Sequence, residues 1–218
     1  MTSTSSNKPE KGDLGETRRS IIRTAHDLFM ELGYRAVSTR KIADSCGLTQ
    51  PALYHHFSNK KELYVEVIKT TIEKTQVAIE RILKQYDNMR DQLLQFSTYM
   101  MMNHHEDLNQ MFHDIEHELD QETQDQIYQW WMKGYLLPVV AIFEKGQQDG
   151  QLKNQEAFGV TPMHAAHYLL SLIKSSMEPA KFVPRKPNDR KKDAEKKSEM
   201  IVDVLLFGLT SDSFRKDT

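Results

Sequence analysis

Side chains that could contact DNA gather within residues 38–63 of the 218-residue chain. A Gln amide can pair with adenine through two hydrogen bonds, and an Arg guanidinium can pair with guanine in the same way. We therefore expect Arg40 and Gln50 to read bases. Hydroxyl, imidazole and ammonium groups bind phosphate oxygens, and the candidates for that role are Thr39, Tyr54, His56 and Lys60. Pro51, Ala52 and His55 could lie against bases or sugars, and Thr49 begins a helix whose free N–H groups attract a phosphate.

Two short helical patterns must position these groups, and they meet at Gly47, which can adopt the left-handed conformation that ends a helix. Ser38 can cap the first pattern and Thr49 the second. Pro51 fits the first turn of the second, where backbone N–H groups have no partner within the helix. The inward residues are Ile42, Ala43, Cys46, Leu53 and Phe57. The pattern predicts a helix-turn-helix, whose second helix enters the major groove of DNA; the alternative is a helical hairpin within a larger core.

A longer helix is predicted on each side of this pair. The first has apolar residues three and four positions apart from Thr17 to Leu32 and ends at Gly33. The other starts at a cap, Ser58 or Asn59, and extends to about residue 83.

The domain organisation follows from these elements. With nine Gly, seven Pro and few alternating runs, the chain is predicted to be all-α, with about nine helices. Residues 1–16 are predicted to be a disordered tail, because they are polar and show no periodicity. Residues 17–62 form the predicted DNA-binding domain of three helices, and residues 63–218 a larger helical domain for effector binding and dimerisation.

Composition narrows the class of protein. Residues 17–62 contain eight Lys/Arg against four Asp/Glu, whereas residues 63–218 contain 19 against 24. A basic first domain suits a polyanion such as DNA. The single cysteine, Cys46, excludes an internal disulfide and a multi-cysteine zinc site. Without an apolar run of membrane-spanning length or an apolar core for a secretion signal, the sequence predicts a soluble, cytoplasmic protein.

Residues 39–63 resemble the DNA-binding signature of the TetR family of bacterial transcriptional regulators. The positions that agree in register, without a gap, are Thr39, Ile42, Ala43, Gly47, Leu53, Tyr54, His56, Phe57, Lys60 and Leu63. The chain departs from many members at Pro51, where they have Gly, and at Cys46, where they have Ala. The resemblance implies a homodimer that binds a palindromic operator, and a second domain that binds a small molecule and thereby releases the DNA. It disfavours the helical hairpin.

Apolar periodicity predicts three more helices between residues 88 and 150. They cover about 88–103, 106–119 and 121–149, the third capped by Asp120 and ended by Gly150. Pro138 lies inside the third helix and should remove one backbone hydrogen bond and kink it. Residues 142–152 are also similar to the end of the seventh helix in many TetR-family regulators.

Two apolar stripes near the C-terminus could form a dimer interface. The helix predicted at 161–178 has apolar residues at the spacing of a coiled-coil seam, namely Met163, Ala166, Leu170, Ile173 and Met177. The last helix follows a solvated Pro/Lys/Arg-rich loop at 179–192, and its stripe is Ile201, Val204, Leu205 and Gly208. The expected use is a four-helix bundle made by two identical chains; the alternative is that both stripes close the core of one chain.

Apolar and aromatic residues of the larger domain could line an effector pocket. They lie on helices that should converge near Pro138, and they are Phe96, Tyr99, Met100, Phe112, Trp131, Tyr135 and Tyr168. Taken one by one, such residues are more often plain core. Their composition favours a small hydrophobic or aromatic effector. With the resemblance, it predicts a ligand-responsive repressor that has no cofactor and is not an enzyme.

An acidic, histidine-rich segment points to another class of function. Residues 91–132 contain no Lys or Arg, and eight Asp/Glu lie between residues 106 and 125. In a helix, His113, Glu116 and His117 would share one face, as ligands of a divalent metal can. The alternatives are therefore a metal- or haem-responsive regulator, or a metal-dependent hydrolase built on the H-x-x-E-H motif. We expect instead a solvated acidic face with partly buried histidines.

Overall fold

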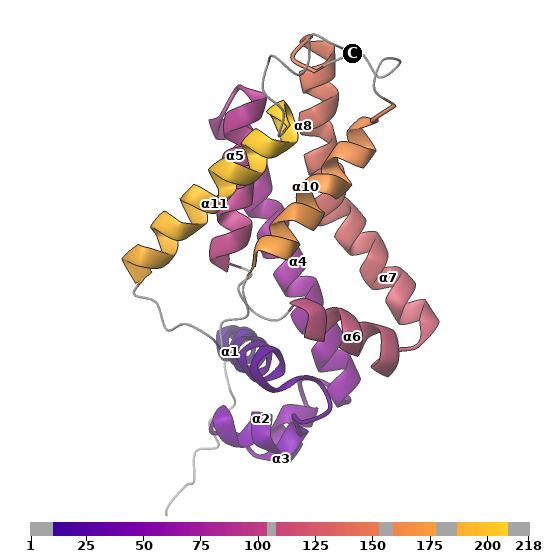
Figure 1. Cartoon of the computed structure of the whole chain (residues 1–218). Helices are drawn as coiled ribbons and strands as arrows, with labels where there is room; N and C mark the ends of the chain where they lie inside the picture. The colour runs from indigo at the N-terminus through magenta and orange to yellow at the C-terminus, as the bar shows by residue number, and fades with distance from the viewer. Residues whose placement is uncertain (1–10, 104–107, 153–158, 178–186, 209–218) are drawn as a thin grey trace, which may run out of the picture. The chain divides into compact units, whose positions relative to one another are not determined.

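The computed structural model describes residues 11–103, 108–152, 159–177 and 187–208, and within these ranges it contains helices and no strand (Figure 1). The elements are α1 (Lys11–Leu32), α2 (Thr39–Ser45), α3 (Gln50–Tyr54), α4 (Lys60–Gln85), α5 (Met89–Asn103), α6 (Leu108–Glu118), α7 (Gln121–Trp131), the π-helical turn η1 (Met132–Leu136), α8 (Leu137–Gln148), α10 (Pro162–Ser176) and α11 (Pro187–Phe207). Because α7, η1 and α8 follow one another without a break, they count as one long helix, which gives nine helices over the described residues. The all-α prediction is confirmed.

The chain divides into two compact units. Unit 1 contains residues 1–70 and 109–127, and unit 2 contains residues 71–108 and 128–218. Both α4 and α7 contribute residues to the two units. The predicted division between residues 62 and 63 falls inside α4.

The first helix of unit 1 is longer than its apolar pattern indicates. It begins at Lys11, inside the segment predicted to be a tail, whereas residues 1–10 lie outside the described residues. The added turns are polar except for Leu14, which is half-exposed, so no apolar stripe marks them in the sequence. The C-terminal end is where the pattern predicts it. Gly33 takes a φ of 79°, and its N–H donates to the Phe29 carbonyl at 2.9 Å.

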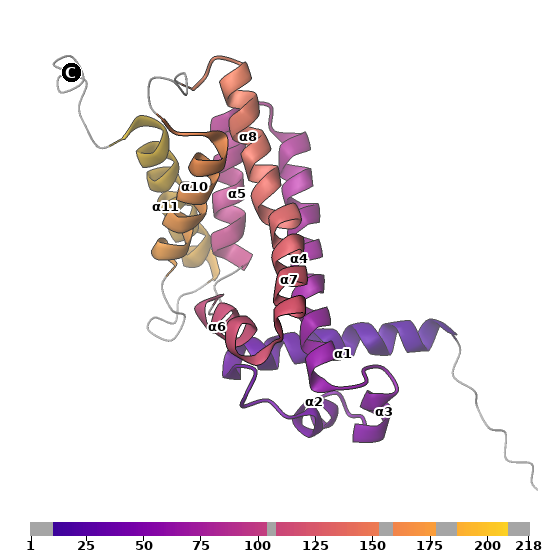
Figure 2. The same ribbon diagram turned by 90° about the vertical axis from the view of Figure 1, so that its right-hand side faces the viewer.

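The core of unit 1 forms where α1 packs on α2 and α2 packs on α3 (Figures 1 and 2). It contains Ile21, Ala25, Phe29, Val37, Ile42, Ala43, Leu53, Phe57, Leu63 and Tyr64, each 2% exposed or less. The prediction that Cys46 is a buried apolar residue is wrong. Cys46 is the C-cap of α2 and is partly exposed, because the chain turns toward Gly47 at that point.

Unit 2 is a bundle in which α5, α8, α10 and α11 run side by side, as Figure 2 shows. Its core includes Ile79, Leu93, Phe96, Leu136, Val139, Phe143, Ala166, Leu169 and Val202. Polar contacts at the surface help to orient the helices of this bundle. In one of them, Arg90 of α5 donates two hydrogen bonds to Asp203 of α11, at 2.8 Å and 3.3 Å. None of the described helices is both long enough and apolar enough to cross a bilayer.

A π-helical turn, η1, directly precedes the helix start that contains Pro138, the residue at which a kink is predicted. Proline has no N–H to give to the helix ladder, and the chain widens just before it. The N–H of Leu137 donates to the carbonyl of Met132, five residues back, and α8 starts afresh with Pro138 in its first turn. Within this turn, Gly134 lies directly against α4. A Cβ atom at Gly134 would lie 2.7 Å from Cγ2 of Ile72.

The two C-terminal helices begin and end close to their predicted bounds, with one correction. Thr161 caps α10, and its hydroxyl accepts from the His164 N–H at 3.1 Å. The predicted loop at 179–192 is wrong in its second half, because α11 already begins at Pro187 and includes Arg190, Lys191 and Lys192. One of these residues, Lys191, pairs with Glu195 four residues further along the helix, at 3.7 Å. Residues 178–186 lie outside the described residues.

Candidate nucleic-acid interface

Local capping interactions shape the two short helices of unit 1. The Ser38 hydroxyl accepts from the Lys41 N–H at 3.1 Å, and the Thr49 hydroxyl accepts from the Ala52 N–H at 3.3 Å. Between them, Gly47 takes a φ of 67°, and the Leu48 N–H donates to the Ala43 carbonyl at 2.9 Å. The result is a tight turn that sets α3 across α2. The predicted helix-turn-helix is therefore present, with the cap residues and the glycine in their predicted roles.

One hydroxyl group joins the two helices on their outer surface. The side-chain amide of Gln50 donates from Nε2 to Oγ1 of Thr39 at 2.9 Å. The phenol oxygen of Tyr54 lies 3.2 Å from the same Oγ1. Of the residues predicted to contact DNA, these three are brought into direct contact with one another.

Arg40 is placed as a base-reading residue would need to be. Its side chain is 81% exposed, and its Nε lies 4.0 Å from the carboxylate of Asp44, whose side chain is 71% exposed. Ion pairs of this kind contribute little in water. The guanidinium can therefore exchange Asp44 for a guanine edge at small cost.

The other residues predicted to contact DNA all lie at the surface. Thr49, Pro51, Tyr54 and His55 are exposed, and Ala52 and His56 are partly exposed. None of the side chains of α3 that we predict to face DNA is needed for the core, which takes Leu53 from this helix. Their contacts with DNA stay predictions.

Lys60, which is predicted to contact a phosphate, makes a contact within unit 1. Its ammonium group lies over the ring of Tyr34, 4.1 Å from the ring centroid. Partial burial lowers the pKa of Lys60, while the carboxylates of Glu118 and Asp114 act in the opposite direction. The side chain is thus engaged with unit 1 itself, although a phosphate contact stays a prediction.

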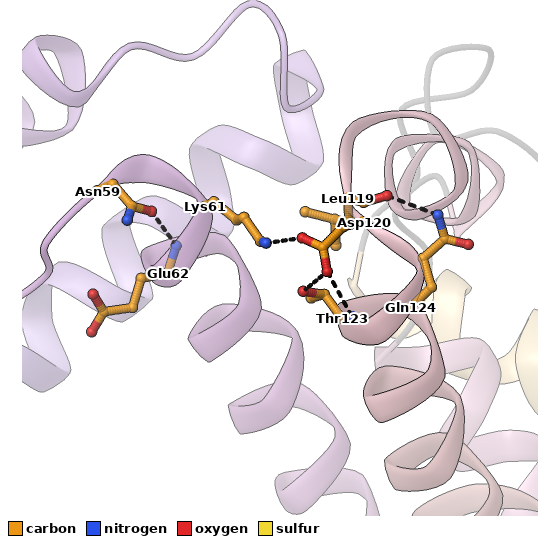
Figure 3. Close-up of polar contacts among 7 residues, drawn as sticks. All are labelled: Asn59, Lys61, Glu62, Leu119, Asp120, Thr123 and Gln124. Carbon is orange, nitrogen blue, oxygen red and sulfur yellow. Dashed lines mark hydrogen bonds and ion pairs between the residues drawn. The ribbon is translucent and has the colours of Figure 1, made fainter.

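The acidic segment supplies contacts to residues on both sides of the helix-turn-helix, and the sequence did not indicate these contacts. Asp114 of α6 accepts from the backbone N–H of Tyr34 at 2.7 Å, and Glu118 pairs with Arg35. Lys61 donates to Asp120, whose second oxygen caps α7 through the N–H and hydroxyl of Thr123 (Figure 3). The partners in these contacts are 59 to 83 residues apart, so no local sequence pattern indicates that they meet. The only indication in the sequence is the unusual lack of Lys and Arg in residues 91–132.

The expected solvated acidic face with partly buried histidines is wrong in its details. His113 and His117 are exposed and stack with their centroids 4.2 Å apart, whereas Asp114 is buried. The His117 Nδ1 lies 2.9 Å from the His113 carbonyl. Among the described residues, no three His, Cys, Asp or Glu side chains are grouped so that they could hold a metal ion. His104 and His105 lie outside those residues.

The residues predicted to line an effector pocket fall into different environments. Phe96, Met100 and Tyr135 are buried in unit 2, and Tyr99 and Trp131 are partly exposed. The Tyr135 hydroxyl donates to the hydroxyl of Thr75 at 3.0 Å, so the apolar interior contains a polar pair. Phe112 is 40% exposed and belongs to unit 1, and Tyr168 is 53% exposed and stacks on His164. Tyr168 therefore faces away from the core of unit 2.

The predicted dimer stripes are divided between core and surface. Ala166, Ile173 and Ile201 are buried within the single chain. Met163, Leu170, Met177, Val204 and Leu205 are partly exposed, and Gly208 is exposed. The surface of α10 and α11 also shows large apolar side chains that the stripes omitted, namely Tyr168, Met200 and Phe207.

Comparison with known proteins identifies the helix-turn-helix. Residues 21–67 match the family model described as bacterial regulatory proteins, tetR family. The class C tetracycline repressor protein of Escherichia coli is 46% identical over 46 residues, which cover 21% of each chain. The regulator TtgR of Pseudomonas putida is 28% identical over 160 residues, covering 67% of this chain and 75% of its own. The chain covers only about a third or less of the lengths of several of the curated relatives that it matches.

The fold recurs in solved structures. The regulator FadR from Bacillus subtilis, in complex with stearoyl-CoA, superposes with a TM-score of 0.67 and 21% sequence identity. The superposition covers 88% of this chain and 99% of FadR. Residues 21–67 are thus similar to the tetR family of bacterial regulatory proteins, and the chain has the same all-helical fold as FadR.

Proposed function

We propose that this protein is a ligand-responsive transcriptional regulator, in the simplest case a repressor, that binds a palindromic operator as a homodimer. The observation that carries the proposal is the outer surface of α2 and α3, where Gln50, Thr39 and Tyr54 form one connected polar group beside the exposed Arg40. Amide and guanidinium groups are the side chains that pair with adenine and guanine. Such a surface serves DNA reading and has no use in the core.

Dimerisation follows from the geometry of DNA reading. One recognition helix contacts too few bases for specificity, whereas two can read half-sites spaced by about 34 Å or a multiple of it. The apolar side chains exposed on α10 and α11, such as Tyr168, Met200 and Phe207, support self-association through these helices. A four-helix bundle from two chains would bury them.

The proposed effector is a small hydrophobic or aromatic molecule that binds unit 2. The interior there is rich in aromatic and Met side chains and contains one buried hydroxyl pair, Tyr135 with Thr75. Because the related fold of FadR holds stearoyl-CoA, acyl-CoA thioesters are the first class to screen. Binding would favour a conformation of the dimer whose two recognition helices no longer match the half-site spacing. We place the protein in the cytoplasm, where the DNA is.

The test is a selection of bound sequences from a random DNA pool, followed by titration of the selected DNA at several salt concentrations. We expect a palindrome, bound more tightly than random DNA by a factor of about a thousand or more. Native mass spectrometry of the protein taken from its own cells should show a dimer, with any retained effector. Equal binding of all sequences would contradict the proposal, as would a monomer on DNA.

A further inference from the structure

The contact between Gln50 and Thr39 fixes a side chain that we expect to read bases. Thr39 is the first residue of α2 and Gln50 the first residue of α3. The bond of 2.9 Å from Gln50 Nε2 to Thr39 Oγ1 thus ties the start of the recognition helix to the start of its partner. Tyr54 lies four residues after Gln50, on the same face of α3, and its phenol oxygen reaches the same hydroxyl at 3.2 Å. One hydroxyl on α2 therefore orients two side chains on α3.

The hydrogen-bonding capacity of the two hydroxyl groups, those of Thr39 and Tyr54, leaves one hydroxyl donor for DNA. A Thr hydroxyl has one hydrogen to donate and two lone pairs that accept. When Thr39 accepts from Gln50 and donates to the phenol oxygen of Tyr54, the Tyr54 hydrogen is free. When Tyr54 donates to Thr39 instead, the Thr39 hydrogen is free. In either direction the cluster keeps one hydroxyl hydrogen for a phosphate oxygen.

The same count shows how the amide of Gln50 is prepared for a base. Its Nε2 has two hydrogens, and Thr39 takes one of them. The second N–H and the carbonyl oxygen Oε1 remain, and these are the donor and acceptor that the N7 and N6 groups of adenine require. The bond to Thr39 decides which end of the amide faces α2. Without it, the amide can rotate and must be ordered again when DNA binds.

We propose that Thr39 is a positioning residue for base recognition, and that sequence preference at the base pair read by Gln50 depends on the Thr39 hydroxyl. This inference rests on the proposed DNA-binding function. It differs from a plain phosphate contact of Thr39, which would strengthen the binding of all sequences alike.

The experiment compares Thr39→Val, which keeps the shape and removes the hydroxyl, with Thr39→Ser, which keeps the hydroxyl. The DNA probes are the palindrome that the wild-type protein selects from a random pool and a set in which each base pair is changed singly. Gln50→Ala identifies the base pair that Gln50 reads, because discrimination there is lost. Thr24→Val on α1 is the matched control for the change from Thr to Val, and the far-ultraviolet circular dichroism of every variant checks its fold.

We expect Thr39→Val to lose discrimination at the Gln50 base pair by about three- to tenfold, the cost of ordering one side chain. At the other base pairs the variant should keep the wild-type preference. Thr39→Ser and Thr24→Val should keep the wild-type value at every pair. The double variant Thr39→Val/Gln50→Ala should lose no more discrimination at that pair than Gln50→Ala alone, because Thr39 acts through Gln50.

The outcomes separate this inference from the proposed function. If the wild-type protein selects no sequence from the pool, the DNA-binding function itself fails. If it selects a palindrome and folded Thr39→Val binds every probe more weakly by one common factor, Thr39 is only a phosphate contact and the inference is wrong. The same conclusion follows if Thr39→Ser behaves like Thr39→Val.

Discussion

The carboxylate of Asp114 accepts a hydrogen bond of 2.7 Å from the backbone N–H of Tyr34. Asp114 lies on α6 and is 3% exposed, and Tyr34 follows α1 directly after Gly33. A buried carboxylate needs such donors, because an unsatisfied charge away from water is costly. This bond makes α6 a structural part of the unit that holds the helix-turn-helix, and it explains one acid of a segment that contains no cations.

Replacing Asp114 should therefore destabilise unit 1. We expect Asp114→Ala to lower the free energy of unfolding by about 1–3 kcal/mol, since it removes the acceptor of a partly buried hydrogen bond. Asp114→Asn should cost less, because the amide oxygen can still accept. Glu116→Ala, an exposed acid on the same helix, is the control and should stay within about 0.5 kcal/mol of wild type. Urea unfolding measures all three, and equal midpoints for Asp114→Ala and Glu116→Ala would contradict this role.

Glu62, in the first turn of α4, should make the free energy of unfolding depend on pH. The hydroxyl of Ser58 donates to Glu62 at 2.6 Å and its backbone N–H donates at 2.8 Å, and these two bonds lower the pKa of Glu62. Since the folded pKa lies below the unfolded value of about 4.3, the stabilisation is complete above that value and is lost as pH falls through the folded pKa. We expect Glu62→Gln to be less stable than wild type at pH 7 and to approach it below about pH 4.

Thermal unfolding of wild type and Glu62→Gln between pH 7 and pH 3 tests this dependence. Ser58→Ala serves as a partial variant, because it removes the hydroxyl bond and keeps the backbone one. Its difference from wild type should have the same sign and a smaller size. A constant difference between wild type and Glu62→Gln across the whole range would show that the carboxylate charge has no part in capping α4.

The sequence predicted local features well and distant contacts poorly. The caps Ser38, Thr49 and Asn59 were readable because each acts on an N–H within three residues, as Asn59 does on Glu62 at 2.8 Å. Gly47 was readable because few other residues tolerate its φ of 67°. The early start of α1 was missed, because exposed polar helix carries no apolar period.

The candidate site shows the same division. The residue types of Arg40 and Gln50 indicated base reading, and the family signature fixed their register. The bond between Thr39 and Gln50, 11 residues apart, depends on the angle between two helices, which no spacing rule gives. The contact of Lys60 with Tyr34 depends on the same tertiary packing. The sequence could therefore identify the residues of the candidate DNA-binding surface, but not the contacts among them.

The close contact at the π-helical turn predicts a specific glycine requirement. A Cβ at Gly134 would lie 2.7 Å from Cγ2 of Ile72, a buried, β-branched side chain whose Cγ2 is bonded directly to its Cβ and is not the end of a long flexible chain. Gly134→Ala should lower the free energy of unfolding by about 1–3 kcal/mol through overpacking. Gly15→Ala is the matched control, because a Cβ there meets nothing within 4 Å. Because Gly15 lies in a helix, Gly15→Ala should leave the free energy of unfolding unchanged or raise it by about 0.5–1 kcal/mol. Similar unfolding midpoints for the two variants would contradict the tight approach of η1 to α4.

The exposed Arg40 and the engaged Lys60 should respond differently to truncation. Arg40→Ala should relax preference at one base pair by about 1–3 kcal/mol and leave protein stability within about 0.5 kcal/mol of wild type. If Lys60 contacts a phosphate, Lys60→Ala should weaken binding to all sequences alike and reduce the slope of log affinity against log salt by about one. Because its ammonium lies 4.1 Å from the Tyr34 ring centroid, Lys60→Ala should also lower stability in the absence of DNA.

Fluorescence anisotropy with the selected palindrome, at several salt concentrations, measures both binding effects, and urea unfolding without DNA measures stability. Lys60→Arg separates the two roles of the lysine, since it keeps the charge for a phosphate and for the ring. It should retain most of the salt slope and most of the stability. If Lys60→Ala alters stability and leaves the salt slope unchanged, Lys60 supports Tyr34 only and does not touch the phosphate backbone. If Arg40→Ala weakens every sequence equally, Arg40 contacts phosphate, and the reading of bases rests on Gln50.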